Sequence, residues 1–201
     1  MRKTLYFLAA LVALNGAAMA QTKTFKIGDA GGMKASQMFQ FESDADFENF
    51  TGVTHKLGGQ FKFDPKARTG SGEIEVDIAS IDTGIPMRNE HLRSPMWFDA
   101  AKFPTAKFET TSVKHKKGDT YTVSGKLTVH GVTRNITTEA DIRYIAESAA
   151  TRKAMFKGDI CRITCDFKVN LKDYGVMIPD MAAGKVSPSI NLRLDVFAYT
   201  G

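Results

Sequence analysis

The stretch ICRITCDFKVNL, residues 160–171, alternates apolar and polar side chains along almost its whole length. An apolar residue stands at every odd position from Cys161 to Val169, and a polar or charged residue stands at every even position from Arg162 to Lys168. A period of two residues is that of a β-strand, whose successive side chains point to opposite faces of a sheet. The stretch therefore predicts an antiparallel strand with one apolar face and one face in water.

The same alternation recurs along the rest of the chain. Ile74, Val76 and Ile78 alternate with acidic residues, and residues 121–129 and 190–196 follow the same pattern. Turns rich in Gly, Asp and Pro separate these runs. The sequence predicts eight strands and a ninth, near residues 36–43, 50–56, 59–64, 72–80, 105–113, 121–130, 134–145, 159–170 and 189–199.

So many strands with one apolar face favour a sheet that closes on itself, because closure leaves no exposed strand edges. Residues 85–103 break the alternation and contain the sequence RNEHLR at residues 88–93, which predicts a short helix and a loop over one end of the barrel. The predicted fold is mainly β: one antiparallel eight-stranded barrel with a short helical insertion near residues 86–94.

Residues 1–20 have the parts of a secretory signal peptide. The charged pair Arg2-Lys3 precedes an apolar run that is shorter than the roughly 20 residues of a membrane-spanning helix. Small residues follow this run, and we expect cleavage near Ala20-Gln21. The expected location is therefore the periplasm of a bacterium or the outside of the cell.

Removing residues 1–20 leaves 181 of the 201 residues and lowers the formal net charge from +5 to +3. A chain of this length suits a single domain with a substantial core. The one basic cluster, residues 114–117, is followed by Gly118-Asp119 and is typical of a solvated turn. We expect no nucleic-acid partner and no integral membrane span.

An eight-stranded barrel has an interior that side chains can fill or that can hold one small ligand. Of the 14 Phe residues, 13 follow residue 20, and Phe39, Phe41, Phe61 and Phe63 stand at alternating positions. We expect any single Phe to pack the core, and the apolar inventory as a whole is also compatible with a tunnel for a lipid.

Motifs for metal binding, nucleophilic catalysis or phosphate binding are absent from the sequence. The four His residues form no close pair, so no metal site is predicted. Cys161 and Cys165 are four residues apart on one predicted strand, about 13 Å at ~3.3 Å per residue. A disulfide needs Cα atoms within roughly 7 Å, so both are predicted to be free thiols that face the interior.

One concentration of polar residues interrupts the apolar strands. Residues 80–84, with the sequence SIDTG, are followed by Arg88, Glu90 and His91. These residues fit a capped, salt-bridged connection in which Asp82 or Thr83 holds the turn. They fit equally well a polar mouth that contacts the headgroup of a ligand.

Several blocks of the chain resemble the hallmark segments of the YceI family. The first runs from residues 72–84 through RNEHL at residues 88–92 to FPTAKF at residues 103–108. The second is GKLTVHGVT at residues 125–133, and the third is NLKDYG at residues 170–175, where the family more typically has Arg at the first position. The resemblance extends over roughly residues 36–199.

This resemblance implies an extended, lipocalin-like barrel that is exported to the periplasm and is often a homodimer. Members of the family bind polyisoprenoids, isoprenoid quinones or fatty-acid amides in an apolar tunnel. The domain is expected to occupy residues 36–201. Residues 21–35 have no clear counterpart in the family and are expected to form an N-terminal arm.

We therefore predict a binding or carrier protein for a long amphiphilic lipid, without a catalytic residue and with no cofactor other than the bound lipid. Headgroup contacts are predicted for Asp82, Arg88 and His91. The predicted tail lining comprises Ile74, Val76, Ile78, Phe108, Leu127, Val129, Ile163, Phe167 and Leu192.

Two alternatives remain open at this level. In the first, the protein is an enzyme that acts on such a lipid or quinone, with His91 as acid or base. This alternative requires a carboxylate within hydrogen-bond reach of the His91 ring. In the second, the protein is a ligand-free interaction module, which requires that side chains fill the barrel completely.

Overall fold

A computed structural model describes residues 21–28 and 37–201. The predicted signal peptide lies outside these residues, as do residues 29–35 of the predicted N-terminal arm. Ten strands form one antiparallel sheet: β1 (Lys23–Ile27), β2 (Met38–Asp44), β3 (Asn49–Thr54), β4 (Leu57–Asp64), β5 (Thr69–Asp77), β6 (Thr105–Lys117), β7 (Thr120–Val129), β8 (Val132–Ile145), β9 (Ile160–Asn170) and β10 (Ser189–Tyr199). The helical elements are η1 (Ile78–Ser80), α1 (Pro86–Arg93), α2 (Ala149–Lys153), η2 (Leu171–Tyr174) and η3 (Asp180–Ala182).

Eight of the strands close into a barrel in the order β1-β4-β5-β6-β7-β8-β9-β10. The ring closes where Lys26 and Ile27 of β1 pair with Tyr199 and Ala198 at the end of β10. The predicted antiparallel eight-stranded barrel is confirmed, and so is the short helix near residues 86–94, which is α1.

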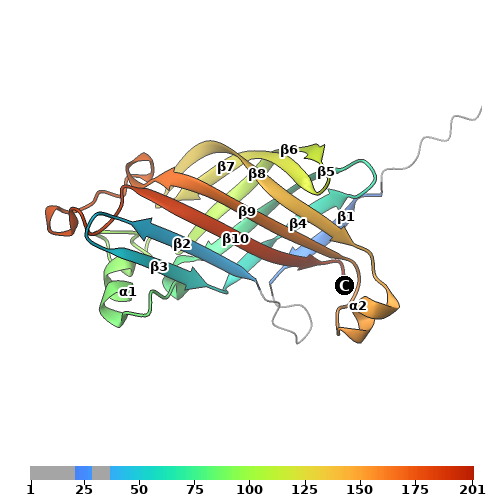
Figure 1. Cartoon of the computed structure of the whole chain (residues 1–201), viewed down its shortest axis with the longest axis horizontal. Helices are drawn as coiled ribbons and strands as arrows, with labels where there is room; N and C mark the ends of the chain where they lie inside the picture. The colour runs from blue at the N-terminus through green and yellow to red at the C-terminus, as the bar shows by residue number, and fades with distance from the viewer. Residues whose placement is uncertain (1–20, 29–36) are drawn as a thin grey trace, which may run out of the picture.

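The hairpin β2–β3 lengthens the barrel toward α1. One edge of β10 has two partners. Its last residues, Ala198 and Tyr199, pair with β1, and residues 191–195 pair with β2. The free side of β3 is joined to the segment after β5 by two backbone hydrogen bonds between Val53 and Asp82, with N···O distances of 2.8 and 2.9 Å. Figure 1 shows α1 with the β2–β3 hairpin at one end of the molecule and α2 with the C-terminus toward the other.

Strand β1 corrects the prediction of an N-terminal arm for its first residues. Phe25 and Ile27 point into the barrel and are buried, whereas Lys26 is exposed. The alternation over Lys23–Ile27 covers only five residues, which is too short to distinguish a strand from an irregular segment. Its pairing with β4 along all five residues makes it part of the barrel wall.

Two groups of buried side chains divide the interior along its length. The first surrounds Phe25, Phe63 and Val196, toward the end where β1 closes the ring. The second surrounds Phe41, Ile81 and Val176, beneath α1 and the segment that joins β9 to β10. Among residues 21–28 and 37–201, no helix has both the length and the apolar character needed to cross a membrane.

Candidate functional site

A large cavity, of about 560 Å³, lies at the α1 end of the barrel and is called the larger cavity below. Strands β2, β9 and β10 supply wall residues such as Phe41, Val169 and Ile190, and α1 and the loop after it supply Leu92 and Trp97. Helix α1 begins at Pro86, which suits the first turn of a helix because that residue needs no backbone hydrogen bond there. The α1 segment and the loops beyond η2 thus cover the end of the barrel without filling it.

A smaller cavity of about 110 Å³ lies deeper in the barrel. Its wall comes from the inward faces of β4 to β10, because alternate residues on each of these strands point to the interior. The two cavities share four wall residues, Phe39, Ala106, Val129 and Leu192, and are therefore neighbours along the barrel axis. Together they form an apolar interior that the protein's own side chains leave unfilled.

The structure places all nine residues of the predicted tail lining on the cavity walls. The inner cavity is lined by Ile74, Val76, Phe108, Leu127, Val129, Ile163, Phe167 and Leu192. Ile78 lines the larger cavity. The period-two pattern placed each of them on the inward face, because the burial of one side of each strand fixes its register.

Arg88 lies in the wall of the larger cavity, where two groups from the β3 side hold it. Its guanidinium donates to the Glu48 carboxylate and stacks on the Phe50 ring, with Cζ 4.2 Å from the ring centroid. Glu48 and Phe50 also line the cavity. The sequence gives no signal for this contact, because Glu48 is 40 residues from Arg88 and only the fold brings the two together.

His91, one helical turn after Arg88, also lines the larger cavity, and its side chain is exposed at the surface. Within the part of the chain that the structure describes, no carboxylate accepts a hydrogen bond from the His91 ring.

Asp82 does not line either cavity and instead holds the connection between β5 and α1. Its carboxylate accepts hydrogen bonds from Asn89 Nδ2 at 2.7 Å and from the Gly84 amide at 2.9 Å, and these two bonds lower the Asp82 pKa. The Asn89 Oδ1 atom in turn accepts from the amide and the hydroxyl of Thr83, both at 2.8 Å. The structure therefore separates the predicted headgroup set: Arg88 and His91 face the cavity, and Asp82 stabilises the turn.

Asn89 is buried and completes this network, although it was not among the predicted site residues. The signal that could have found it is its place on α1. It follows Arg88 directly, so it points away from the cavity and back toward the turn at residues 82–84.

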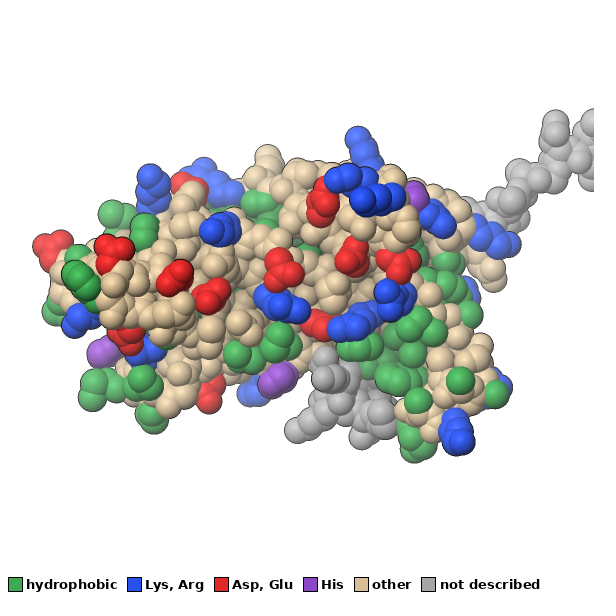
Figure 2. Space-filling model, in the orientation of Figure 1, with side chains coloured by type: hydrophobic (Ala, Val, Ile, Leu, Met, Phe, Trp, Pro, Cys, Tyr) green, Lys and Arg blue, Asp and Glu red, His purple; other side chains and the backbone are tan. Residues whose placement is uncertain are grey.

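The larger cavity is open to solvent through a rim of flexible apolar side chains. The rim comprises Ile85, Met87, Met96 and Met181, which line the cavity although they are 46, 70, 59 and 80% exposed. Figure 2 shows hydrophobic side chains at the surface of the end of the molecule that carries α1. Methionine adapts its shape to different partners, so this rim suits the entry of an apolar molecule.

Both cysteines are free thiols. Cys161 is buried in the core, and Cys165 lines the inner cavity. Burial raises the pKa of each thiol to about 12, so neither is a reactive thiolate at neutral pH. In residues 21–28 and 37–201, no three His, Cys, Asp or Glu side chains are grouped so that they could hold a metal ion.

Comparison with known proteins gives one consistent family. The sequence model of the YceI-like domain matches residues 32–198. The chain is 32% identical over 200 residues to a UPF0312 protein of Azotobacter vinelandii, covering 98% of this chain and 97% of that protein. It is 31% identical over 199 residues to protein YceI of Salmonella newport, with the same coverage of 98% and 97%.

Solved structures show the same fold. BcnA of Burkholderia cenocepacia superimposes with a TM-score of 0.69 at 23% identity, covering 82% of this chain and 98% of that one. A polyisoprenoid-binding domain from Saccharophagus degradans, implicated in plant cell wall breakdown, superimposes with a TM-score of 0.66 at 16% identity. That match covers 89% of this chain and 99% of the other.

Proposed function

This chain belongs to the YceI family, and from that premise we propose that it binds the tail of a long amphiphilic lipid and carries it through the periplasm. The ligand class that we propose is a polyisoprenoid, an isoprenoid quinone or a fatty-acid amide. A polyisoprenoid-binding domain has the same fold, which supports lipid binding in general.

The observation that carries the proposal is the unfilled apolar interior. Each CH₂ group that moves from water into such an interior contributes about 0.8 kcal/mol, reduced by the cost of ordering the chain. Protein interiors are normally packed without such voids, so a cavity of about 560 Å³ next to a second one is a feature that a ligand-free interaction module does not need.

The polar groups at the rim of the larger cavity are better suited to binding a headgroup than to catalysing a reaction. Arg88 is held in place by Glu48 and Phe50, and His91 stands one helical turn further along α1. We propose that these two side chains contact the headgroup while the tail enters the barrel between Leu192 and Phe39. Such a site needs few polar anchors and no catalytic residue.

Organic extraction of protein purified from the periplasm of its own host, followed by mass spectrometry, tests the proposal. Ala106 lines both cavities, so Ala106→Phe fills the passage between them and serves as the occluded comparison. Ala101→Phe adds the same ring at an exposed position and is the matched control.

We expect one equivalent of an amphiphilic lipid from the wild-type protein and from Ala101→Phe, and little or none from Ala106→Phe. The same lipid yield from all three proteins would mean that the lipid adheres outside the barrel. Folded protein that yields no lipid, and that takes up none from added fatty-acid amides, would contradict the proposal.

A further inference from the structure

The barrel is hollow toward α1, whereas buried aromatic side chains pack its interior toward α2, and we propose that a layer of aromatic rings at this packed end sets the longest lipid tail that this protein accepts. The inference rests on the proposed lipid binding and concerns the specificity of the same site. It makes the aromatic layer a determinant of tail length, separate from the residues that line the cavities.

The aromatic layer consists of Phe25, Phe61, Phe63, Tyr121 and Tyr144. Its rings form a continuous series, with centroid distances of 6.4 Å between Phe25 and Tyr144, 6.4 Å between Phe25 and Phe61, 5.6 Å between Phe61 and Phe63, and 5.9 Å between Phe63 and Tyr121. They come from β1, β4, β7 and β8, so the series crosses the interior from one side of the barrel to another. Aromatic pairs at these distances are mutually attractive.

The inner cavity ends against this layer. Phe61 is the one ring of the layer that lines the cavity, and Phe25 and Phe63 behind it are 0 and 1% exposed. Val123 and Ile142 line the same cavity and also pack in the cluster that contains Phe25. A tail that passes Phe108 and Leu127 therefore meets the Phe61 ring, which is backed by the buried rings of Phe25 and Phe63.

Polar contacts hold the layer from its outer side. The Tyr144 hydroxyl donates to Asp159 at 3.0 Å, and the Lys23 ammonium donates to that hydroxyl at 3.0 Å and pairs with the same carboxylate. The other oxygen of Asp159 accepts the Glu147 amide at 2.7 Å.

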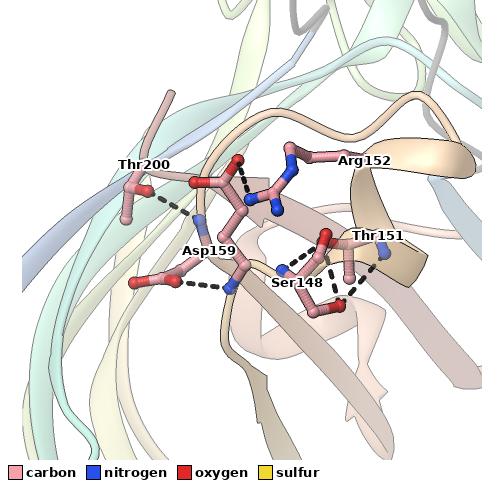
Figure 3. Close-up of polar contacts among 6 residues, drawn as sticks. Ser148, Thr151, Arg152, Asp159 and Thr200 are labelled. Atoms are coloured by element: carbon pink, nitrogen blue, oxygen red, sulfur yellow. Dashed lines mark hydrogen bonds and ion pairs between the residues drawn. The ribbon is translucent and has the colours of Figure 1, made fainter.

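The backbone around this carboxylate is also fixed. Figure 3 shows the Asp159 amide donating to Thr200 Oγ1, at 2.9 Å, and Ser148 capping α2 through Thr151. These contacts join β1, β8, the segment before α2 and the residue after β10, and they hold the packed end closed.

The layer predicts a break in the dependence of affinity on tail length. Each further CH₂ that enters the cavities strengthens binding by about fourfold. Once the tail reaches Phe61, further CH₂ groups stay in water at the rim and the gain stops. The position of the break measures the distance from the rim to the aromatic layer.

The test uses a homologous series of straight-chain fatty-acid amides, with tails that lengthen by two carbons at a time. Affinities for the full mature chain are measured by displacement of a fluorescent fatty acid. In Phe61→Ala we expect the break to move to tails longer by roughly four to six carbons, the size of the ring removed. Phe156→Ala is the matched control. It also removes a phenyl ring, but one that stacks on Tyr199 outside the cavities, and its break should lie at the same tail length as in the wild type.

A second variant keeps the test decisive if Phe61→Ala does not fold. Ala140 lines the inner cavity, and Ala140→Leu adds bulk just in front of the layer. Its break should move to shorter tails while short amides bind as tightly as to the wild type. A wild-type affinity that rises without a break, or a break unmoved in the folded variants, would overturn the inference. If the wild-type protein bound no amide of any length, the proposed function itself would fail.

Discussion

The Arg88 guanidinium stacks on Phe50 with Cζ 4.2 Å from the ring centroid, at the wall of the larger cavity. Because Glu48 pairs with the same guanidinium, the positive charge is held in place before any ligand arrives. A side chain that is already ordered loses less entropy when it forms a new contact. Arg88 is thus suited to orient a polar headgroup at the proposed entry point of the tail.

Arg88→Ala should weaken binding of a fatty-acid amide by roughly 10-fold or more, since hydrogen bonds to charged groups contribute about 1.5–3 kcal/mol. Displacement of a fluorescent fatty acid measures the change. Arg152→Ala, which removes an exposed guanidinium on α2, is the matched control and should leave the affinity unchanged. Equal affinities for both variants and the wild type would exclude a headgroup role for Arg88.

Asn89→Ala should lower the free energy of unfolding by about 1–3 kcal/mol, because the amide and the hydroxyl of Thr83 lose the acceptor that the buried Asn89 side chain provides. Asn49→Ala removes an exposed amide from β3 and should cost less than about 0.5 kcal/mol. Urea denaturation measures both. Similar midpoints for the two variants would show that the network around Asp82 contributes little to stability.

Gly125→Ala on β7 should destabilise the barrel by roughly 1–3 kcal/mol through overpacking. A Cβ at this position would lie 2.4 Å from the Phe108 ring and 2.5 Å from the Glu109 carbonyl oxygen. Gly58→Ala is the matched control, because a Cβ there meets nothing within 4 Å. Thermal unfolding compares the two, and a Gly125→Ala variant as stable as Gly58→Ala would contradict the close approach of β6 and β7.

Acid should weaken the packed end of the barrel through Asp159. Burial alone would raise its pKa, but the hydrogen bonds from Lys23, the Glu147 amide and Tyr144 outweigh burial and lower it below the ordinary value of 3.8. A carboxyl whose pKa is depressed in the folded state stabilises the fold above its unfolded pKa. This contribution is lost as the pH falls through the folded value.

The free energy of unfolding, measured by urea denaturation from pH 6 down to pH 2, should therefore fall less steeply below about pH 4 in Asp159→Asn than in the wild type. Asp166→Asn, an exposed substitution on β9, should retain the wild-type slope. Parallel slopes for the wild type and Asp159→Asn would rule out this carboxylate as a source of the acid sensitivity.

Thiol titration should give two free thiols per chain in denaturant without reductant, since Cys161 and Cys165 are not bonded to each other. In the native protein at pH 8, a pKa of about 12 makes alkylation slower than for an ordinary thiol, by roughly 1,000-fold. A titration of zero in denaturant would show a disulfide, and rapid native alkylation would show that the inner cavity admits water freely.

The alternation of apolar and polar residues was sufficient to predict the barrel and its cavity lining, because a strand's period of two assigns each side chain to one face. It did so for Ile163 and Phe167 as well as for Ile74 and Leu192. Strand β1 was missed because five residues provide too few alternations to stand out.

The details of the candidate site depend on contacts between distant segments. Whether Asp82 faces a ligand or holds a turn depends on Asn89, and the position of Arg88 depends on Glu48 and Phe50 in β3 and the turn before it. The spacing of residues 80–91 along the sequence does not predict either set of contacts. The aromatic layer has the same character, since Phe25, Phe61 and Tyr121 meet only after the ring of strands closes.

Trp97 is the single tryptophan of the sequence and lies in the wall of the larger cavity. Its indole emission depends on the polarity of its surroundings, and the proposed entry of a tail would change those surroundings from water to hydrocarbon. No other indole contributes a background signal, so the intrinsic fluorescence of the unlabelled protein reports occupancy at the mouth. Trp97 is thus an intrinsic fluorescent reporter of ligand binding, and it lies away from the packed end, whose aromatic residues are tyrosine and phenylalanine.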